Sequence, residues 1–287
     1  MLISSEIPVK YLDRLGYLND YPFIINIYRD IPKYREYYIN ACQNSKISFL
    51  DSGFFENWEN GTDFDTSINA LAEGVEIFQP MYVFSEEKFG DWEYTVEKSK
   101  EFKNFFKDKV KIATCVHGST YDDFIKCYRA LMEGDFCDLV AFSHKFAFHD
   151  EIIKNNPYLK CDNKYLELSL VRVFVVKQML NLSSRYKKPI HLLGCNNPIE
   201  IDMLRIFDQI ISADTSSPFI YGASGKSYNQ MGILPDGKIH QGKNYMDRAF
   251  ERLDSEDYTI IHSALCNIDI NYDWLKYGCH PWVMNRE

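Results

Sequence analysis

Residues 209–240 read QIISADTSSPFIYGASGKSYNQMGILPDGKIH, and the rest of the chain can be ordered around this pattern. A short apolar run, residues 210–213, leads to the carboxylate of Asp214 and a Thr-Ser-Ser-Pro turn. A loop rich in Gly, Ser and Asn and a Pro-Asp-Gly turn follow. In parallel α/β folds, side chains at the carboxyl ends of strands line the ligand site. The pattern therefore predicts that Asp214 lies at the edge of a sheet where ligands bind.

A simpler structural role for Asp214 is equally compatible with these residues. Its carboxylate could cap the turn by accepting a hydrogen bond from the amide of Ser216 or Ser217. A second strand end of the same design, Ile-Ser-Phe-Leu-Asp-Ser-Gly at residues 47–53, favours a chemical role, because it places Asp51 in the same way. Two carboxylates at strand ends are what a double-displacement reaction needs.

The same alternation of strand and helix runs along the chain. Strands are expected at residues 22–28, 46–50, 81–84, 110–116, 137–142, 189–193, 210–213 and 259–265, with helices at 33–43, 65–76, 92–107, 121–133, 166–182, 199–207 and 272–277. The units repeat at roughly thirty residues, which is typical of a (β/α)8 TIM-like barrel. A doubly wound open sheet is the competing fold, but G-x-G-x-x-G and G-x-x-x-x-G-K-[ST] are both absent. We predict a single domain over residues 1–287, with 241–287 as the segment that closes the barrel.

Composition narrows the class of protein. With 287 residues, 46% hydrophobic and 25% charged, the chain can bury one large core. It contains no run of 18 apolar residues and no secretory signal, so we expect no membrane partner and a cytoplasmic location. The eight cysteines form no C-x-x-C pair, which predicts buried thiols rather than a metal site or disulfides. A net charge of −9 argues against a general polyanion binder but leaves room for a local basic groove.

Several strand ends, taken in order, resemble one family. Leu50-Asp51-Ser52-Gly53-x-Phe55 resembles the D-S-G-G-[YF] motif of the tRNA-guanine transglycosylases, and Cys115-Val-His-Gly118 resembles their V-Q-G-G strand end. His191-Leu-Leu-Gly194 is similar to their [YH]-L-M-G, followed by a Pro-acidic helix start at residues 198–200. Asp214-Thr-Ser-Ser-Pro218 with residues 232–237 is similar to the segment that carries their nucleophile. The matches are in family order and cover about residues 45–240.

The departures from that family narrow the expected substrate. The C-x-C-x-x-C…H zinc site of the tRNA enzymes is missing, as are the Thr-Arg pair and the extra length that grip an anticodon loop. A shortened, zinc-free chain is similar to the phage DNA 7-deazaguanine transglycosylases, the DpdA family. This resemblance implies exchange of guanine in DNA for a free 7-deazaguanine base such as preQ0, with no metal and no cofactor. A phage-encoded chain would act in the host cytoplasm.

The resemblance also implies roles for individual residues. Asp214 would be the nucleophile and Asp51 the general acid/base, which together form and resolve a covalent glycosyl intermediate. Phe55 and Leu193 would sandwich the base. Base recognition would fall to a set of residues at the other strand ends, namely Ser52, Gly53, Ser85, Glu86, His117, Ser143, His144 and Gly194. His117 and His144 could equally bind loop backbone only.

The nucleic acid requires positive charge close to the nucleophile. The candidates that follow Asp214 in the sequence are Lys226, Lys238, Lys243 and Arg248. Three alternatives stay open at this stage: a tRNA-guanine transglycosylase that has lost its zinc, a (β/α)-barrel glycoside hydrolase using the same two carboxylates, and a non-catalytic binding subunit derived from the barrel. Retention of both Asp51 and Asp214 argues against the last of these.

Overall fold

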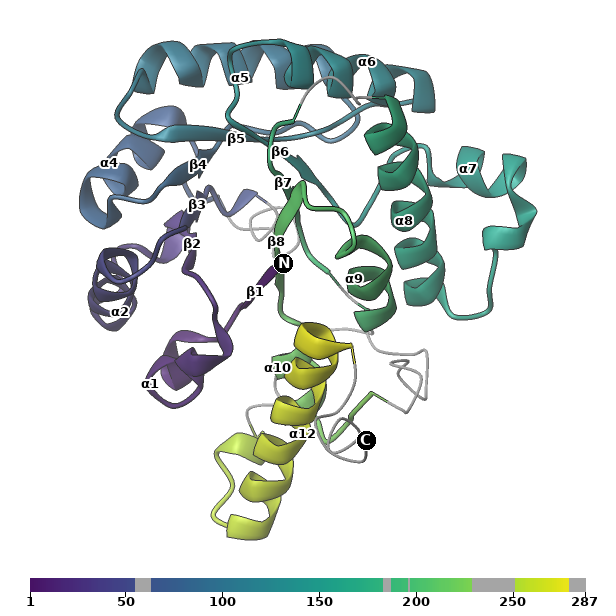
Figure 1. The fold of residues 1–287 in the computed structure, drawn as a ribbon. Coiled ribbons are helices and arrows are strands. Elements are labelled where there is room, and N and C mark those ends of the chain that lie inside the picture. Colours follow the sequence, from purple (N-terminus) through teal and green to yellow (C-terminus); the bar gives the residue numbers. More distant parts are fainter. Residues whose placement is uncertain (55–62, 183–186, 196, 229–250, 279–287) are drawn as a thin grey trace.

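The computed structural model contains eight parallel strands that alternate with helices in a nearly closed barrel (Figure 1). It describes residues 1–54, 63–182, 187–195, 197–228 and 251–278. The strands are β1 (Leu2–Ser5), β2 (Phe23–Ile25), β3 (Phe49–Asp51), β4 (Tyr82–Phe84), β5 (Lys111–Cys115), β6 (Leu139–Phe142), β7 (Ile190–Leu192) and β8 (Ile210–Thr215). Their order is β1-β8-β7-β6-β5-β4-β3-β2, and every ladder is parallel. The predicted (β/α)8 fold class is confirmed.

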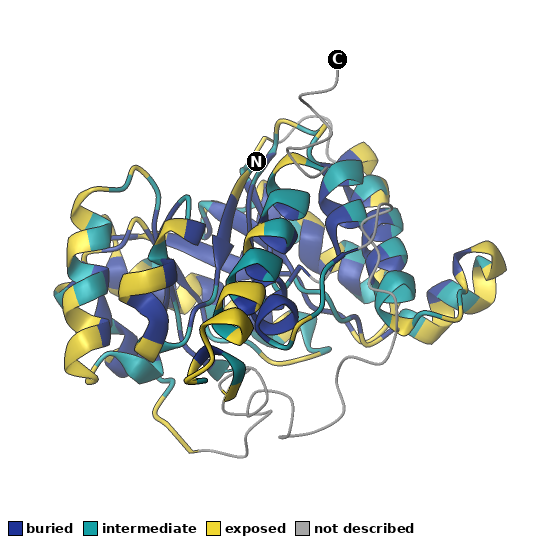
Figure 2. Cartoon of the chain, turned by 90° about the horizontal axis from the view of Figure 1, so that it is seen from below, coloured by how far each residue is buried: buried dark blue, intermediate teal, exposed yellow. Residues whose placement is uncertain are grey.

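The helices form the outer layer around these strands (Figure 1). They are α1 (Leu12–Leu15), α2 (Pro32–Gln43), α4 (Ile68–Phe78), α5 (Trp92–Phe106), α6 (Tyr121–Glu133), α7 (His149–Asn155), α8 (Lys164–Leu182), α9 (Pro198–Leu204), α10 (Ser217–Ala223) and α12 (Tyr258–Tyr277). Several begin at a side chain that caps the first turn, such as Asp91 before α5 and Thr120 before α6. Figure 2 shows buried strands inside a ring of helices whose outer sides are exposed. No helix within the described residues is both long enough and apolar enough to cross a membrane.

Alternation along each strand separates two hydrophobic clusters. One cluster fills the barrel interior and includes Phe23, Phe49, Phe84 and Cys115, while the other lies between the strands and the helices and includes Leu50. Successive side chains of a strand point to opposite faces. Asp51, two residues beyond the inward Phe49, therefore continues the inner face at the carboxyl end of β3.

The seam between β1 and β2 has no continuous ladder and is bridged by side chains and by one backbone hydrogen bond, from the Asp20 amide to the Ile3 carbonyl at 2.9 Å. The Asn19 side-chain oxygen accepts hydrogen bonds from the Ser5 amide, at 2.6 Å, and the Ser4 hydroxyl, at 3.0 Å. Asp20 accepts from the Ile3 amide at 3.0 Å and also binds the ammonium group of Lys276 on α12. These contacts close the barrel where β1 would otherwise present an unpaired edge.

Three sequence predictions about secondary structure and barrel closure were wrong. Residues 2–5 form β1, which pairs with β8, so the amino-terminal strand and not the tail closes the barrel. Residues 259–265, predicted as a strand, belong to α12, which is capped by Asp257 and packs against α10. A Cβ at Gly222 of α10 would lie 2.3 Å from the Ile268 amide nitrogen, so glycine is what permits this close packing. Residues 217–223, predicted as the turn and loop after Asp214, form α10 itself.

Candidate active site at the strand ends

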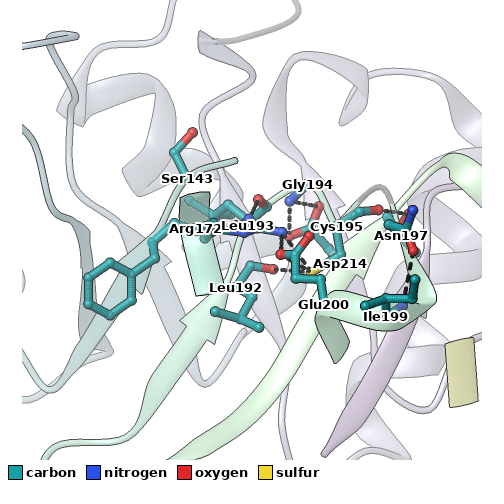
Figure 3. Close-up of polar contacts among 12 residues, drawn as sticks. Ser143, Arg172, Leu192, Leu193, Gly194, Cys195, Asn197, Ile199, Glu200 and Asp214 are labelled. Atoms are coloured by element: carbon teal, nitrogen blue, oxygen red, sulfur yellow. Dashed lines mark hydrogen bonds and ion pairs between the residues drawn. The ribbon is translucent and has the colours of Figure 1, made fainter. Parts of the chain in front are cut away.

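Asp214 lies near the end of β8 with 2% of its surface exposed. Its Oδ1 lies 2.9 Å from Nε2 of His191. The Gly194 amide donates to both carboxylate oxygens, at 3.2 and 3.1 Å (Figure 3). The side chain of Thr215 caps the turn that follows, because its hydroxyl accepts a hydrogen bond from the Ser217 amide at 3.0 Å. Asp214 thus projects toward β7, and Thr215 fills the turn-capping role considered for Asp214.

His191 orients this carboxylate from inside the barrel. Its ring stacks on Phe23, with centroids 5.6 Å apart, and lies 4.7 Å from the ring centroid of Phe49. Burial, together with the positive charge of Arg172, lowers the pKa of His191 to about 3. The ring is therefore neutral at physiological pH. An ionised carboxylate can only accept a hydrogen bond, so we assign the ring proton to Nε2, and Nδ1 then accepts from the Ser212 hydroxyl at 2.8 Å.

Glu6 brings a second carboxyl group to Asp214. It follows β1 directly, and its amide donates to the Thr215 carbonyl at 2.9 Å. Burial raises the pKa of Asp214 to about 6, while a hydrogen bond from the Glu6 side chain, the Gly194 amide bond and the charge of Arg172 oppose that rise. Glu6 and Asp214 are therefore neighbouring carboxyl groups joined by a side-chain hydrogen bond.

Asp51 is the other sequence-predicted carboxylate and ends β3. It is half-buried, and its Oδ1 accepts a hydrogen bond from the Gly53 amide at 2.8 Å. Gly53 has a φ of 81°, in the left-handed region that favours glycine, and a Cβ there would meet Ile27 at 2.9 Å. This turn holds Asp51 at the mouth of the barrel. On the short path around the barrel, β2 and β1 lie between Asp51 and Asp214.

A buried ion pair supports the end of β7 from behind. Arg172 on α8 and Glu200 on α9 are both almost fully buried and form an ion pair (Figure 3). The Arg172 guanidinium also donates to the backbone carbonyls of Phe142, at 3.3 Å, and Leu193, at 2.5 Å. It thereby joins the ends of β6 and β7 and fixes the peptide before Gly194, whose amide binds Asp214. Arg172 is a positioning residue that sequence analysis missed.

Two residues predicted to recognise the base point elsewhere. Ser85 is buried, and its hydroxyl lies 3.0 Å from that of Thr114 in a chain that continues to Ser99 on α5. Glu86 accepts from the Tyr94 hydroxyl at 2.5 Å and pairs with Lys98 at 3.2 Å, both also on α5. Both side chains therefore join the barrel to α5, and the base-recognition role predicted for them is not supported by these contacts.

His117 lies where the sequence placed it, beyond β5, but faces a neighbour that was not predicted. Its Nε2 lies 2.8 Å from a carboxylate oxygen of Glu87, and 6% of its surface is exposed. The Cys115 thiol lies beside this pair, and its sulfur, a His117 ring nitrogen and a Glu87 oxygen all lie within 4.8 Å of one another. Burial, followed by the charge of Glu87, raises the pKa of the Cys115 thiol well above its usual value.

The remaining predicted contacts lie at the ends of β3, β6 and β7, and His144 among them contacts Gly194. This residue has a φ of 65°, and a Cβ there would lie 2.8 Å from the His144 ring, so His144 packs directly over it. Leu193 packs against the inner cluster. The Ser143 hydroxyl accepts from the Lys145 amide at 3.4 Å, and the buried Ser52 hydroxyl accepts from the Phe54 amide at 3.1 Å.

The predicted nucleic-acid contacts are described only at Lys226. Its backbone amide donates to the Tyr221 carbonyl at 2.8 Å, and its carbonyl accepts from the Asn271 side chain at 2.9 Å. These bonds fix the segment after α10 against α12. Phe55 and three of the predicted basic residues, Lys238, Lys243 and Arg248, lie outside the described residues.

No protein-family model matches this chain, and no curated protein matches it. Function must therefore be argued from the site itself.

Proposed function

We propose that this protein is a base-exchange transglycosylase that replaces guanine in DNA with a free 7-deazaguanine base. The observation that carries the proposal is the buried carboxylate of Asp214, oriented by His191 and the Gly194 amide. A nucleophile held in one orientation by two donors spends little free energy on positioning when it attacks. Asp51 adds a more exposed carboxylate on the inner face of another strand end.

The chemistry assigned to these residues uses a double displacement. An oxygen of Asp214 attacks C1′ of the target nucleotide, the C1′–N9 bond breaks, and Asp51 gives a proton to the departing guanine. The incoming base then loses its N9 proton to Asp51 and attacks C1′, which releases Asp214 as a carboxylate. Each step conserves atoms and charge, and retention of the sugar configuration follows from the two inversions.

DNA is the proposed nucleic acid because the chain resembles the shortened, zinc-free branch of the transglycosylases. A base stacked within a duplex cannot reach a carboxylate that is 2% exposed, so the target guanine must be flipped out or presented in a single strand. Leu193, which packs against the inner cluster, and Phe55 are proposed to hold the base between them. His144 packs over Gly194, whose amide binds Asp214, and both residues are proposed to contact the incoming base.

The decisive experiment measures exchange directly. Purified protein is incubated with labelled guanine or preQ0 and, in separate reactions, with duplex DNA, single-stranded DNA and tRNA. We expect label to enter DNA, and a protein–DNA adduct to survive denaturing electrophoresis of quenched reactions. Exchange into tRNA at an equal or greater rate would refute the DNA assignment alone. Release of free base without incorporation would indicate a hydrolase, and binding without either reaction would indicate a non-catalytic subunit.

A further inference from the structure

Three potential metal ligands converge at the carboxyl ends of β4 and β5. Cys115 is the last residue of β5, His117 lies two residues beyond it, and Glu87 lies in the loop after β4. Their ligand atoms all lie within 4.8 Å of one another. The Cys115 side chain is completely buried and belongs to the inner cluster, and 6% of the His117 surface and 16% of the Glu87 side chain are exposed.

The orientation of Glu87 sets it apart from the residues before it. Ser85 and Glu86 turn outward to α5, where each has hydrogen-bond partners. Glu87 turns toward the strand ends, and its carboxylate meets His117 and the Cys115 thiol. Buried groups of this kind are stable when they are hydrogen-bonded to one another, as here, or when they coordinate a metal. A divalent cation would balance a thiolate, a carboxylate and a neutral imidazole to zero net charge.

We propose that Glu87, Cys115 and His117 bind one zinc ion, with a fourth position left for water or a substrate atom. Zinc accepts sulfur, nitrogen and oxygen ligands together, whereas calcium and magnesium select oxygen. Ligand atoms of a tetrahedral zinc site lie about 3.3–3.6 Å from one another. The 2.8 Å contact between His117 and Glu87 would open slightly and the thiol would move inward. The ligand atoms now lie within 4.8 Å of one another, so shifts of about 1 Å bring them to zinc-site spacing.

Neighbouring groups provide the support that metal ligands usually have. The Ser143 amide donates to the Cys115 sulfur, a bond that stabilises thiolate. The Phe89 ring meets the His117 ring edge-on, with centroids 6.1 Å apart. This site is independent of the proposed base exchange, in which zinc takes no step. It does reassign His117 from base recognition to metal binding.

Zinc binding tests the proposal on the whole chain. The protein is stripped with a chelator, dialysed, and titrated with Zn²⁺ against a chromophoric competitor; a parallel titration with Co²⁺ records the absorption spectrum. We expect one tight site and, with Co²⁺, a thiolate-to-metal charge-transfer band. Cys115→Ser should abolish that band, and Glu87→Gln should weaken zinc binding by more than the about 10–100-fold typical of changes outside the ligand shell.

Two matched controls separate this site from other ligands in the chain. Glu86→Gln removes the adjacent carboxylate, and Cys266→Ser removes a thiol that lies 3.6 Å from His262 on α12, a pair that could bind metal weakly at the surface. Both variants should keep the tight site and the band. Circular dichroism checks folding; if Cys115→Ser fails to fold, Glu87→Gln decides.

The proposal fails if the wild type binds no stoichiometric zinc, or if Glu87→Gln binds it as tightly as Glu86→Gln does. Loss of the band in Cys266→Ser with its retention in Cys115→Ser would also overturn it. Asp214→Asn should bind zinc normally, so failure of the base-exchange proposal leaves this test unaffected.

Discussion

The two sides of the barrel mouth differ in how their polar groups are held. On the β7–β8 side, Asp214, His191 and Arg172 are buried, and each has at least two polar neighbours within hydrogen-bond distance. On the β3–β5 side, Asp51 is half-buried and His117 contacts a carboxylate on a loop. The first arrangement suits a nucleophile that must not move, and the second suits groups that exchange protons or ligands. The predictions below test this division.

The largest effect is expected for Asp214→Asn. The amide keeps the size of the carboxylate but cannot attack C1′, so exchange should fall by about three orders of magnitude or more. The measurement is the initial rate of label incorporation into DNA. Asp122→Asn, an exposed change on α6, serves as the control and should keep the full rate. Retention of more than about a tenth of the rate would be incompatible with covalent catalysis.

Removal of Arg172 tests the support behind the β7–β8 side. Arg172→Met leaves Glu200 buried without its partner, which should lower the free energy of unfolding by about 3–5 kcal/mol. The same change removes the donor that fixes the Leu193 carbonyl, so exchange should also slow. Denaturant titration measures the first effect. The double variant Arg172→Met/Glu200→Gln should recover much of the stability and little of the rate; recovery of both would show that Arg172 only balances charge.

Sequence analysis predicted the barrel because its signal is repeated in every unit. Apolar runs of strand length, each ending in a polar or glycine residue, require no knowledge of long-range contacts. The structures of residues 2–5 and 259–265 were not predicted correctly from such local patterns. β1 is a short strand recognisable only by its pairing with β8, and an isoleucine-rich segment such as residues 259–265 suits strand or helix until its packing against α10 is known.

Sequence analysis could predict those candidate site residues that belong to strand-end motifs. It could not predict residues that reach the site only through the pairing of strands or the packing of helices. Asp214 and Asp51 could be identified from their local patterns. Glu6 could not, because its place beside Asp214 follows from the β1–β8 pairing. Arg172 left one signal, a lone cation within the apolar stretch of α8, but its partner Glu200 lies on the next helix. The absence of C-x-x-C spacing predicted no metal, whereas the proposed zinc ligands come from two separate strand ends.

A smaller effect, on DNA affinity, is expected for the lysines that are proposed to bind the DNA strand. Lys226→Glu together with Lys243→Glu should weaken DNA binding roughly tenfold at low salt and reduce the salt-dependence slope by about two, one for each lost phosphate contact. Binding of the free base should be unchanged. Lys154→Glu with Lys160→Glu makes the same change in net charge at exposed positions near α7. Equal losses of DNA affinity in both double variants would show that net charge, and not a local cationic surface at Lys226 and Lys243, governs binding.

The smallest and most discriminating effect concerns the hydrogen-bonded carboxyl groups of Glu6 and Asp214. Asp214 attacks only when ionised, and its pKa is about 6, so log kcat/KM should fall with unit slope as pH drops below that value. Glu6→Ala removes a hydrogen bond that favours the ionised form. The pKa of Asp214 should then rise and the acid limb should move to higher pH, with the plateau rate nearly unchanged. Glu6→Gln keeps a donor and should leave the limb close to its wild-type position. If Glu6 were instead the ionised partner, Glu6→Ala would remove a like charge and move the limb to lower pH. The direction of that shift therefore decides which carboxyl group holds the proton before substrate binds.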